Sequence, residues 1–166
     1  MDDLYSLSDQ LGQVLREKGL YLVTAESCTG GLFGHLITEV PGSSDYYLGS
    51  FVTYSNEAKM RFLGVSPETL EKNGAVSEQT VREMAAGARQ AYAGIQPLEK
   101  IIAVAISGVA GPGGGTNDKP VGTVWIGFEG KNYGKQCKFL FEGNRSQVKQ
   151  QSAIQAVQMI SDEFRE

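Results

Sequence analysis

Ser27 has the type and position of a nucleophile in an acyl-transfer site. It lies between an apolar segment at residues 20–25 and a second apolar stretch that begins at Leu32. We interpret the first as a buried strand and the second as a helix, which puts Ser27 at a strand–helix junction. Unpaired N–H groups at a helix start can stabilise an oxyanion. The candidate oxyanion donors are the residues that follow, Thr29, Gly30 and Gly31.

The same residues also have a structural interpretation. Ser27 or Thr29 could cap the helix, with the two glycines permitting close packing. The segment does not match the G-x-S-x-G elbow, because Ala25 stands where the first glycine belongs. Cys28 is a rival nucleophile, although a single thiol beside an apolar helix more often belongs to a core. Both interpretations stay open at this point.

A serine nucleophile needs a base, and the better candidate is a lysine. His35, the one histidine, lies two helical turns beyond Ser27, so we expect it to point elsewhere. Lys59 follows an expected strand at residues 46–54, and Tyr54 at the end of that strand could relay or donate a proton. A lysine acts as a base only when burial or nearby positive charge lowers its pKa toward neutrality. Composition alone also allows a solvated helix lysine.

Glycines concentrate in the loop at residues 107–115, which holds five of them. The loop follows a near-continuous apolar run, Ile101 to Ile106, typical of a central strand covered on both faces. Ligands bind at this place in open α/β sheets, and exposed backbone amides can approach a phosphate or carboxylate. The loop is neither a Walker motif nor a GxGxxG fingerprint. A flexible surface loop is the alternative.

The order of elements predicts the layers that position these residues. Helices and strands alternate from the N-terminus, and residues 121–129 and 133–141 then form an expected β-hairpin. Ser66-Pro67 and Ser77 begin helices, and Asn144 to Gln147 resembles a capping box that opens a long final helix. We therefore expect an α/β fold, a three-layer α/β/α sandwich on a mixed sheet, in a single domain over residues 1–166.

Composition excludes several classes of function. The chain has 166 residues and a formal charge of −4, whereas nucleic-acid binders normally show a basic excess. Two cysteines and one histidine cannot assemble a Cys/His zinc site. There is no signal-peptide pattern and no run of about 18 apolar residues. We expect a cytoplasmic protein without a nucleic-acid or membrane partner.

Five segments, in chain order, carry a resemblance to a known family. They are Thr24-Ala-Glu-Ser-Cys-Thr-Gly-Gly31, Phe51-Val-Thr-Tyr-Ser-Asn-Glu-Ala-Lys59, Gly74-Ala-Val-Ser77, Ser107-Gly-Val-Ala-Gly-Pro112 and Lys119-Pro-Val-Gly-Thr-Val-Trp125. Together they resemble the successive motifs of the CinA C-terminal domain family. The resemblance implies an α/β/α fold, a homodimer, no metal and no cofactor. It also implies a Ser-Tyr-Lys catalytic set on Ser27, Tyr54 and Lys59.

Stand-alone members of that family include amidohydrolases that convert nicotinamide mononucleotide and water into nicotinate mononucleotide and ammonia. With that small-molecule nucleotide as substrate, Arg145 becomes the candidate for its phosphate, unless it is a solvated first-turn arginine. Glu26 could orient Lys59 or accept from ribose hydroxyls. Further substrate contacts are expected from the glycine loop, at Ser107, Gly108 and Gly111.

Two other functions stay open. One is a non-catalytic nucleotide- or partner-binding module linked to competence or DNA damage, as some family members are. The other is an amidase for a different small amide, which would share the mechanism but not the ligand.

Overall fold

The computed structural model describes residues 2–164, with side chains from residue 5 onward, and is built on one mixed five-stranded sheet. The strand order is β2-β1-β3-β4-β5. The parallel strands are β1 (Tyr21–Glu26), β2 (Tyr47–Val52) and β3 (Ile101–Gly108). The antiparallel hairpin consists of β4 (Thr123–Glu129) and β5 (Gly134–Leu140). The predicted mixed sheet with a late hairpin is confirmed.

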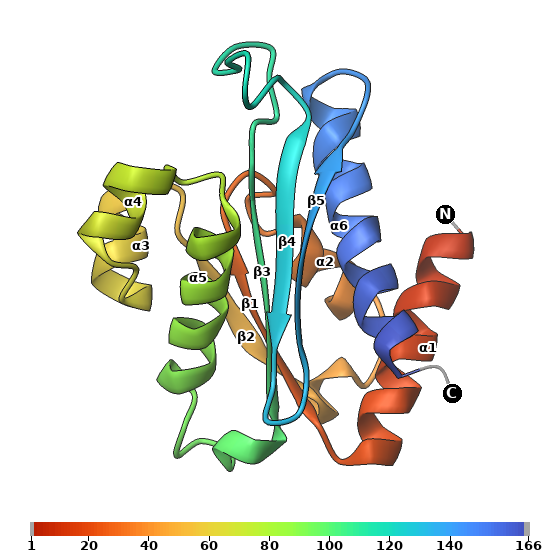
Figure 1. The fold of residues 1–166 in the computed structure, drawn as a ribbon. Helices are drawn as coiled ribbons and strands as arrows, with labels where there is room; N and C mark the ends of the chain where they lie inside the picture. The colour runs from red at the N-terminus through yellow and green to blue at the C-terminus, as the bar shows by residue number, and fades with distance from the viewer. Residues whose placement is uncertain (1, 165–166) are drawn as a thin grey trace.

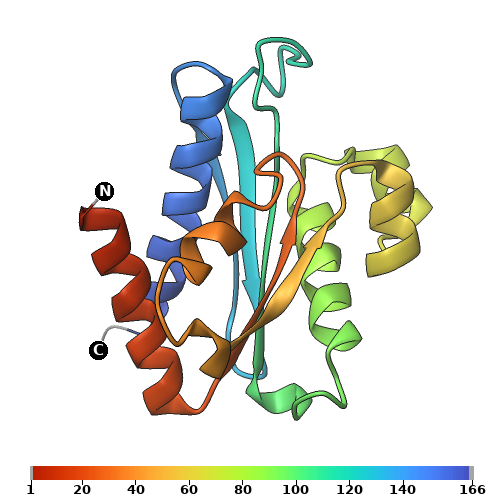
Figure 2. The ribbon, with the colours of Figure 1, turned by 180° about the vertical axis from the view of Figure 1, so that it is seen from behind.

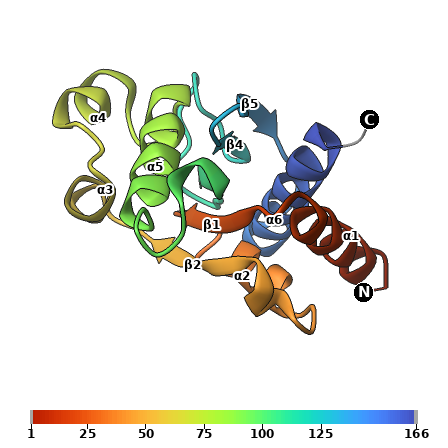
Figure 3. The same ribbon diagram turned by 90° about the horizontal axis from the view of Figure 1, so that it is seen from below.

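Helices cover both faces of this sheet (Figures 1 and 3). One face carries α1 (Asp2–Lys18), α2 (Leu32–Thr38) and α6 (Arg145–Glu163). The other carries α5 (Glu78–Ala91), with α3 (Asn56–Leu63) and α4 (Pro67–Asn73) packed outside it. Two short 3₁₀ helices, η1 (Ser43–Asp45) and η2 (Leu98–Lys100), precede β2 and β3. The three-layer α/β/α architecture is therefore confirmed as well.

Strand β3 explains why both faces must be covered. Its first seven residues are all buried, and successive side chains point to opposite faces. Ile102, Val104 and Ile106 belong to the core beneath α1, α2 and α6. Ile101, Ala103 and Ala105 belong to the core beneath α5. The near-continuous apolar run is thus a central strand with helices on both sides.

The helix starts expected from local signals are present. The Ser66 and Ser77 hydroxyls accept hydrogen bonds from the Thr69 and Thr80 N–H groups, at 3.0 and 3.1 Å. At α6, the Asn144 side chain accepts from the Gln147 N–H at 3.0 Å. In return, the Gln147 side chain accepts from the Asn144 N–H at 2.8 Å. This reciprocal pair is the predicted capping box, and it fixes the orientation of the first turn of α6.

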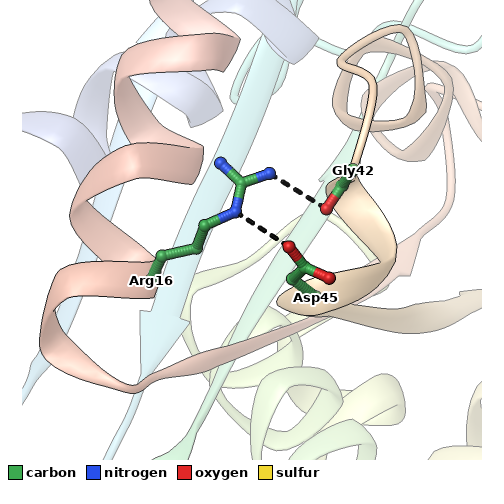
Figure 4. Close-up of polar contacts among 3 residues, drawn as sticks. All are labelled: Arg16, Gly42 and Asp45. Atoms are coloured by element: carbon green, nitrogen blue, oxygen red, sulfur yellow. Dashed lines mark hydrogen bonds and ion pairs between the residues drawn. The ribbon is translucent and has the colours of Figure 1, made fainter.

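Arg16 fastens the end of α1 to the segment that leads into β2 (Figure 4). Its guanidinium donates to the Gly42 carbonyl at 2.9 Å and to the Asp45 carboxylate at 3.2 Å. The same group lies over the Tyr46 ring, 5.0 Å from its centroid. These contacts tie the end of α1 to the segment before the start of β2 (Figure 2). Among the described residues, no helix is long and apolar enough to cross a membrane.

Candidate active site

Three parallel strands end beside one cavity. Ser27 follows β1, Tyr54 lies two residues beyond β2, and β3 ends in the glycine loop. Because the strands are parallel, their carboxyl ends meet at one edge of the sheet, where open α/β folds bind ligands. A cavity of about 270 Å³ at this edge is lined by Ser27, Tyr54, Lys59, Arg145 and residues 107–111. The loop after β3 rises above the sheet at the top of Figure 1.

Ser27 and Lys59 form a hydrogen-bonded pair in this cavity. The Lys59 ammonium lies 2.9 Å from the Ser27 hydroxyl oxygen, across 32 residues of sequence. It also donates to the carbonyl oxygens of Thr53 at 2.8 Å and Tyr54 at 3.3 Å. The Lys59 side chain is only 1% exposed and Ser27 only 7%. Because Lys59 is buried, the interpretation of it as a solvated helix lysine is wrong. All three of its acceptors are neutral oxygens.

Burial sets the protonation of the two candidate groups that flank Ser27. Desolvation lowers the pKa of Lys59, because the charged ammonium loses water without gaining a carboxylate. Burial also raises the pKa of the Cys28 thiol to about 11. A thiol with that pKa stays protonated at neutral pH, whereas Lys59 shifts toward the neutral amine. The environment therefore favours a serine–lysine pair over a cysteine nucleophile.

Tyr54 and Arg145 lie together on the rim of the cavity. The Tyr54 hydroxyl accepts a hydrogen bond from the Arg145 guanidinium at 2.8 Å, and its side chain is 61% exposed. A second guanidinium nitrogen donates to the Gly111 carbonyl at 2.7 Å. Arg145 thus joins α6, the segment after β2 and the glycine loop. The structure brings it to the site, and it is not merely a solvated first-turn arginine.

Glu26 has a different role from either one that the sequence suggested. Its carboxylate is fully buried and accepts from the N–H groups of Gly31, Phe33 and Gly34, at 3.0, 3.1 and 2.8 Å. It also accepts from the Thr29 hydroxyl at 2.6 Å. With four donors around it, the carboxylate caps α2 from the preceding strand and satisfies the N–H groups of Phe33 and Gly34 in its first turn. Glu26 neither orients Lys59 nor faces a ribose, and neither Ser27 nor Thr29 is the cap.

The N–H groups predicted to hold an oxyanion are largely engaged elsewhere. The Gly30 N–H donates to the Ser27 carbonyl at 3.1 Å, and the Gly31 N–H donates to Glu26. The cavity lining does not include Thr29, Gly30 or Gly31. It does include Ala110 and Gly111, whose N–H groups make no hydrogen bond within residues 2–164. The N–H groups of Gly30 and Gly31 are therefore not free to hold an oxyanion, whereas those of Ala110 and Gly111 are unpaired beside the cavity.

The first part of the glycine loop is packed rather than loose. At Gly111 the backbone has φ +84°, and a Cβ there would lie 2.4 Å from the Val121 side chain. At Gly108 a Cβ would lie 2.8 Å from the Thr123 carbonyl oxygen. Ser107, 1% exposed, donates its hydroxyl hydrogen to the Ala75 carbonyl at 2.7 Å. For residues 107–111 the flexible-loop alternative is wrong, because close approaches fix this wall.

Several lining residues escaped the sequence analysis. Asn56 begins α3 beside Tyr54, and Ala75 and Val76 line the cavity from the segment before α5. Asn56 could have been found, since it lies inside the Phe51–Lys59 segment. His35 does not line the cavity and lies 3.8 Å from the exposed Glu39 carboxylate. Within residues 2–164, no group of three or more His, Cys, Asp or Glu side chains is placed to hold a metal ion.

Comparison with known proteins assigns the family. The sequence model of the CinA C-terminal domain matches residues 4–164. The chain belongs to the CinA C-terminal domain family. A crystal structure of a competence or damage-inducible protein from Enterobacter asburiae is similar to it, with a TM-score of 0.90 and 36% identity over 98% of both chains. The resemblance expected from five motifs is thus confirmed over nearly the whole chain.

Members of this family similar to the chain differ in length and in name. A protein from Enterobacter agglomerans named nicotinamide-nucleotide amidohydrolase PncC is 49% identical over 163 residues, which cover 97% of this chain and 95% of that protein. A CinA-like protein from Chloroherpeton thalassium is 52% identical over 121 residues, which cover 73% of this chain but 27% of that protein. The chain therefore spans nearly the whole length of some relatives and only about a third of others.

Proposed function

We propose that this protein hydrolyses the carboxamide of nicotinamide mononucleotide to nicotinate mononucleotide and ammonia. The observation that carries the proposal is the buried pair of Ser27 and Lys59, 2.9 Å apart in a cavity that also holds Arg145. The full-length similarity to a protein named nicotinamide-nucleotide amidohydrolase supports the choice of substrate. The proposed unit is one amidohydrolase domain over residues 1–166.

In the proposed first half-reaction, Ser27 attacks the carboxamide carbon. Neutral Lys59 accepts the hydroxyl proton as the Ser27 oxygen bonds to that carbon. The protonated Lys59 side chain is stabilised by the Thr53 and Tyr54 carbonyl oxygens, which contact it in the structure. Lys59 then returns the proton to the amide nitrogen, the C–N bond breaks and ammonia leaves. The product of this half is an ester of Ser27.

In the second half, water hydrolyses that ester. Lys59, neutral again, accepts a proton from water as its oxygen attacks the ester carbon. The proton then passes to the Ser27 oxygen as the ester bond breaks, which releases nicotinate mononucleotide. Tyr54 is a second candidate proton donor to the leaving ammonia. Its exposed hydroxyl and its bond to Arg145 give it a place at the rim rather than between Ser27 and Lys59.

The negative charges of the reaction have candidate partners in the cavity wall. The unpaired N–H groups of Ala110 and Gly111 are the proposed oxyanion donors in place of the engaged N–H groups of Gly30 and Gly31. The Arg145 guanidinium supplies positive charge for the substrate phosphate beside the loop that it holds. In the proposed complex the reacting amide lies on the Ser27 side of the cavity and the phosphate on the Arg145 side.

Ammonia release from nicotinamide mononucleotide tests the proposal. Purified wild-type protein should release ammonia and nicotinate mononucleotide in equal amounts. Ser27→Ala should bind the nucleotide yet lose turnover, because the hydroxyl adds little ground-state affinity. Cys28→Ala is the matched control beside it and should keep most activity. Loss of activity in Cys28→Ala with retention in Ser27→Ala would contradict the nucleophile assignment.

The same assay separates the other functions. Binding of the nucleotide without ammonia release would support a non-catalytic module, and release only from other small amides would support a different amidase. The homodimer and the cytoplasmic location expected from the sequence stay predictions, and light scattering of the purified protein tests the first.

A further inference from the structure

A second cavity lies next to the one that holds Ser27. It has a volume of about 390 Å³ and is lined by three lysines, Lys72, Lys119 and Lys138, together with Trp125. Val76 lines both cavities, whereas Ser27, Tyr54, Lys59 and Arg145 line only the first. The two cavities are therefore neighbours with separate chemistry, and the proposed deamidation uses none of the residues peculiar to the second.

The second cavity carries positive charge in a protein whose net charge is −4. Of its two carboxylates, Glu78 is already paired with Arg82 on α5, which leaves Asp118 against three ammonium groups. The side chains of Lys72 and Lys138 make no hydrogen bond or ion pair within the part of the chain that the structure describes. Lys119 donates to the Asn73 carbonyl and has two further N–H groups. This excess of unpaired positive charge suits an anion such as a phosphate.

An aromatic surface accompanies the charge. Trp125 on β4 is half-buried and packs against the core beneath α5, while also lining the cavity. Lys138 is its direct cross-strand partner on β5. Indole rings stack on flat aromatic groups such as nucleic-acid bases. The volume lies in the range of small-molecule sites, roughly 300–1,000 Å³. The cavity thus combines an aromatic surface with positive charge.

Two of the five motifs that identify the family meet here. Val76 and Ser77 come from one of them, and Lys119 and Trp125 from the other. Residues 73–77 form the wall between the cavities. On one side of this wall, the Lys119 ammonium donates a hydrogen bond to the Asn73 carbonyl. On the other side Ser107 is bonded to the Ala75 carbonyl. Gly74 has φ +75°, and a Cβ there would lie 3.1 Å from the Lys119 ammonium, so this wall is closely fitted to the lysine.

We infer that this second cavity is a binding site for a nucleoside monophosphate, with the base on Trp125 and the phosphate among Lys72, Lys119 and Lys138. The ligand is defined by chemistry alone, as a phosphate monoester that carries a flat aromatic ring. The site is distinct from the Ser27 cavity and needs no turnover there.

Trp125 makes the inference directly measurable, because it is the only tryptophan in the chain. Adenosine monophosphate has no carboxamide, so it can be titrated into the wild-type protein while tryptophan fluorescence is recorded. We expect a saturable change, with adenosine binding at least about tenfold more weakly for lack of the charged phosphate. Lys138→Gln and Lys119→Gln should each weaken the binding of adenosine monophosphate by a similar factor. Lys131→Gln, in the hairpin turn outside the cavity, is the matched control and should bind as the wild type does.

The competing outcomes are distinct. No saturable fluorescence change at millimolar adenosine monophosphate would overturn the inference, as would equal binding of adenosine. Loss of the signal in Arg145→Ala, with Lys138→Gln unaffected, would place the nucleotide in the Ser27 cavity instead and would also overturn it. Equal weakening in Lys131→Gln would show diffuse charge attraction rather than a site. Lys138 is exposed, so its variant tests the inference even where Lys119→Gln fails to fold. The deamidation assay is a separate measurement, so failure of either proposal is recognised by itself.

Discussion

Two buried charged side chains flank the end of β1 and serve opposite purposes. Lys59 donates to neutral oxygens only, which lowers its pKa and suits it to proton transfer. The Glu26 carboxylate accepts four hydrogen bonds and thereby caps the start of α2. Burial without a charged partner thus gives a reactive group at Lys59. Burial among many donors gives a structural group at Glu26.

The role of Glu26 predicts a loss of stability. An amide in Glu26→Gln presents one acceptor oxygen where the carboxylate presents two, and its NH₂ group would face N–H donors. Hydrogen bonds to charged groups are each worth about 1.5–3 kcal/mol, so the free energy of unfolding should fall by about 2–4 kcal/mol. Urea unfolding followed by circular dichroism measures this change. Glu57→Gln on the exposed side of α3 is the control, and an unfolding midpoint equal in the two variants would contradict the capping role.

At the scale of elements, the packing of α5 against α3 sets the position of Lys59. Gly87 in α5 faces the end of α3, where a Cβ would lie 1.8 Å from the Leu63 carbonyl oxygen. Leu63 is four residues beyond Lys59 in the same helix. The helices can approach this closely only because a glycine occupies that position, and the approach holds the lysine near β1.

Gly87→Ala should therefore affect both stability and catalysis. The added methyl group must push α3 away, and overpacking of this kind costs about 1–3 kcal/mol. Because α3 carries Lys59, kcat should fall while the KM for nicotinamide mononucleotide changes less. Gly134→Ala, where a Cβ would meet nothing within 4 Å, is the matched control in β5. A stable Gly87→Ala enzyme with unchanged kcat would show that this contact does not position the lysine.

Elements were more predictable than their contacts. The starts of α4, α5 and α6 carry local capping signals, and β3 has an uninterrupted apolar run, so short windows of sequence suffice for them. The cap of α2 was missed, because Glu26 reaches it from the preceding strand across the Ser27 turn. Local sequence also could not show which N–H groups near Ser27 are already bonded. The Gly31 N–H donates to Glu26 and the Gly30 N–H donates to the Ser27 carbonyl, so neither group is free for a ligand.

At the scale of the whole molecule, the site is assembled from segments far apart in sequence. Arg145 contacts Tyr54, 91 residues away, and Gly111, 34 residues away. Sequence placed each residue near a strand or helix end but could not pair them, because local patterns carry no information on long-range contacts. The resemblance to a family supplied the Ser-Tyr-Lys set. The second cavity, with Lys119 and Trp125, had no local signal of a site.

Arg145 should contribute mainly to binding. If its guanidinium holds the phosphate equally in the ground and transition states, Arg145→Ala should raise the KM for nicotinamide mononucleotide at least about tenfold with a smaller change in kcat. Steady-state kinetics of ammonia release measure both constants. Arg61→Ala, on α3 and outside the cavity lining, should leave both constants unchanged. An unaltered KM in Arg145→Ala would remove the arginine from the substrate site.

The pH dependence of kcat in the wild type and in Lys59→Arg tests the central claim most directly. Because burial lowers the pKa of Lys59, the neutral amine gains population as pH rises through that pKa, and the wild-type kcat should rise with it and then level off. Arginine keeps the charge, but its pKa stays above about 12, so it cannot accept the Ser27 proton near neutral pH. Lys59→Arg should be slower by at least about 10²-fold, as slow as Lys59→Ala. A Lys59→Arg enzyme with a kcat near that of the wild type would contradict the serine–lysine mechanism.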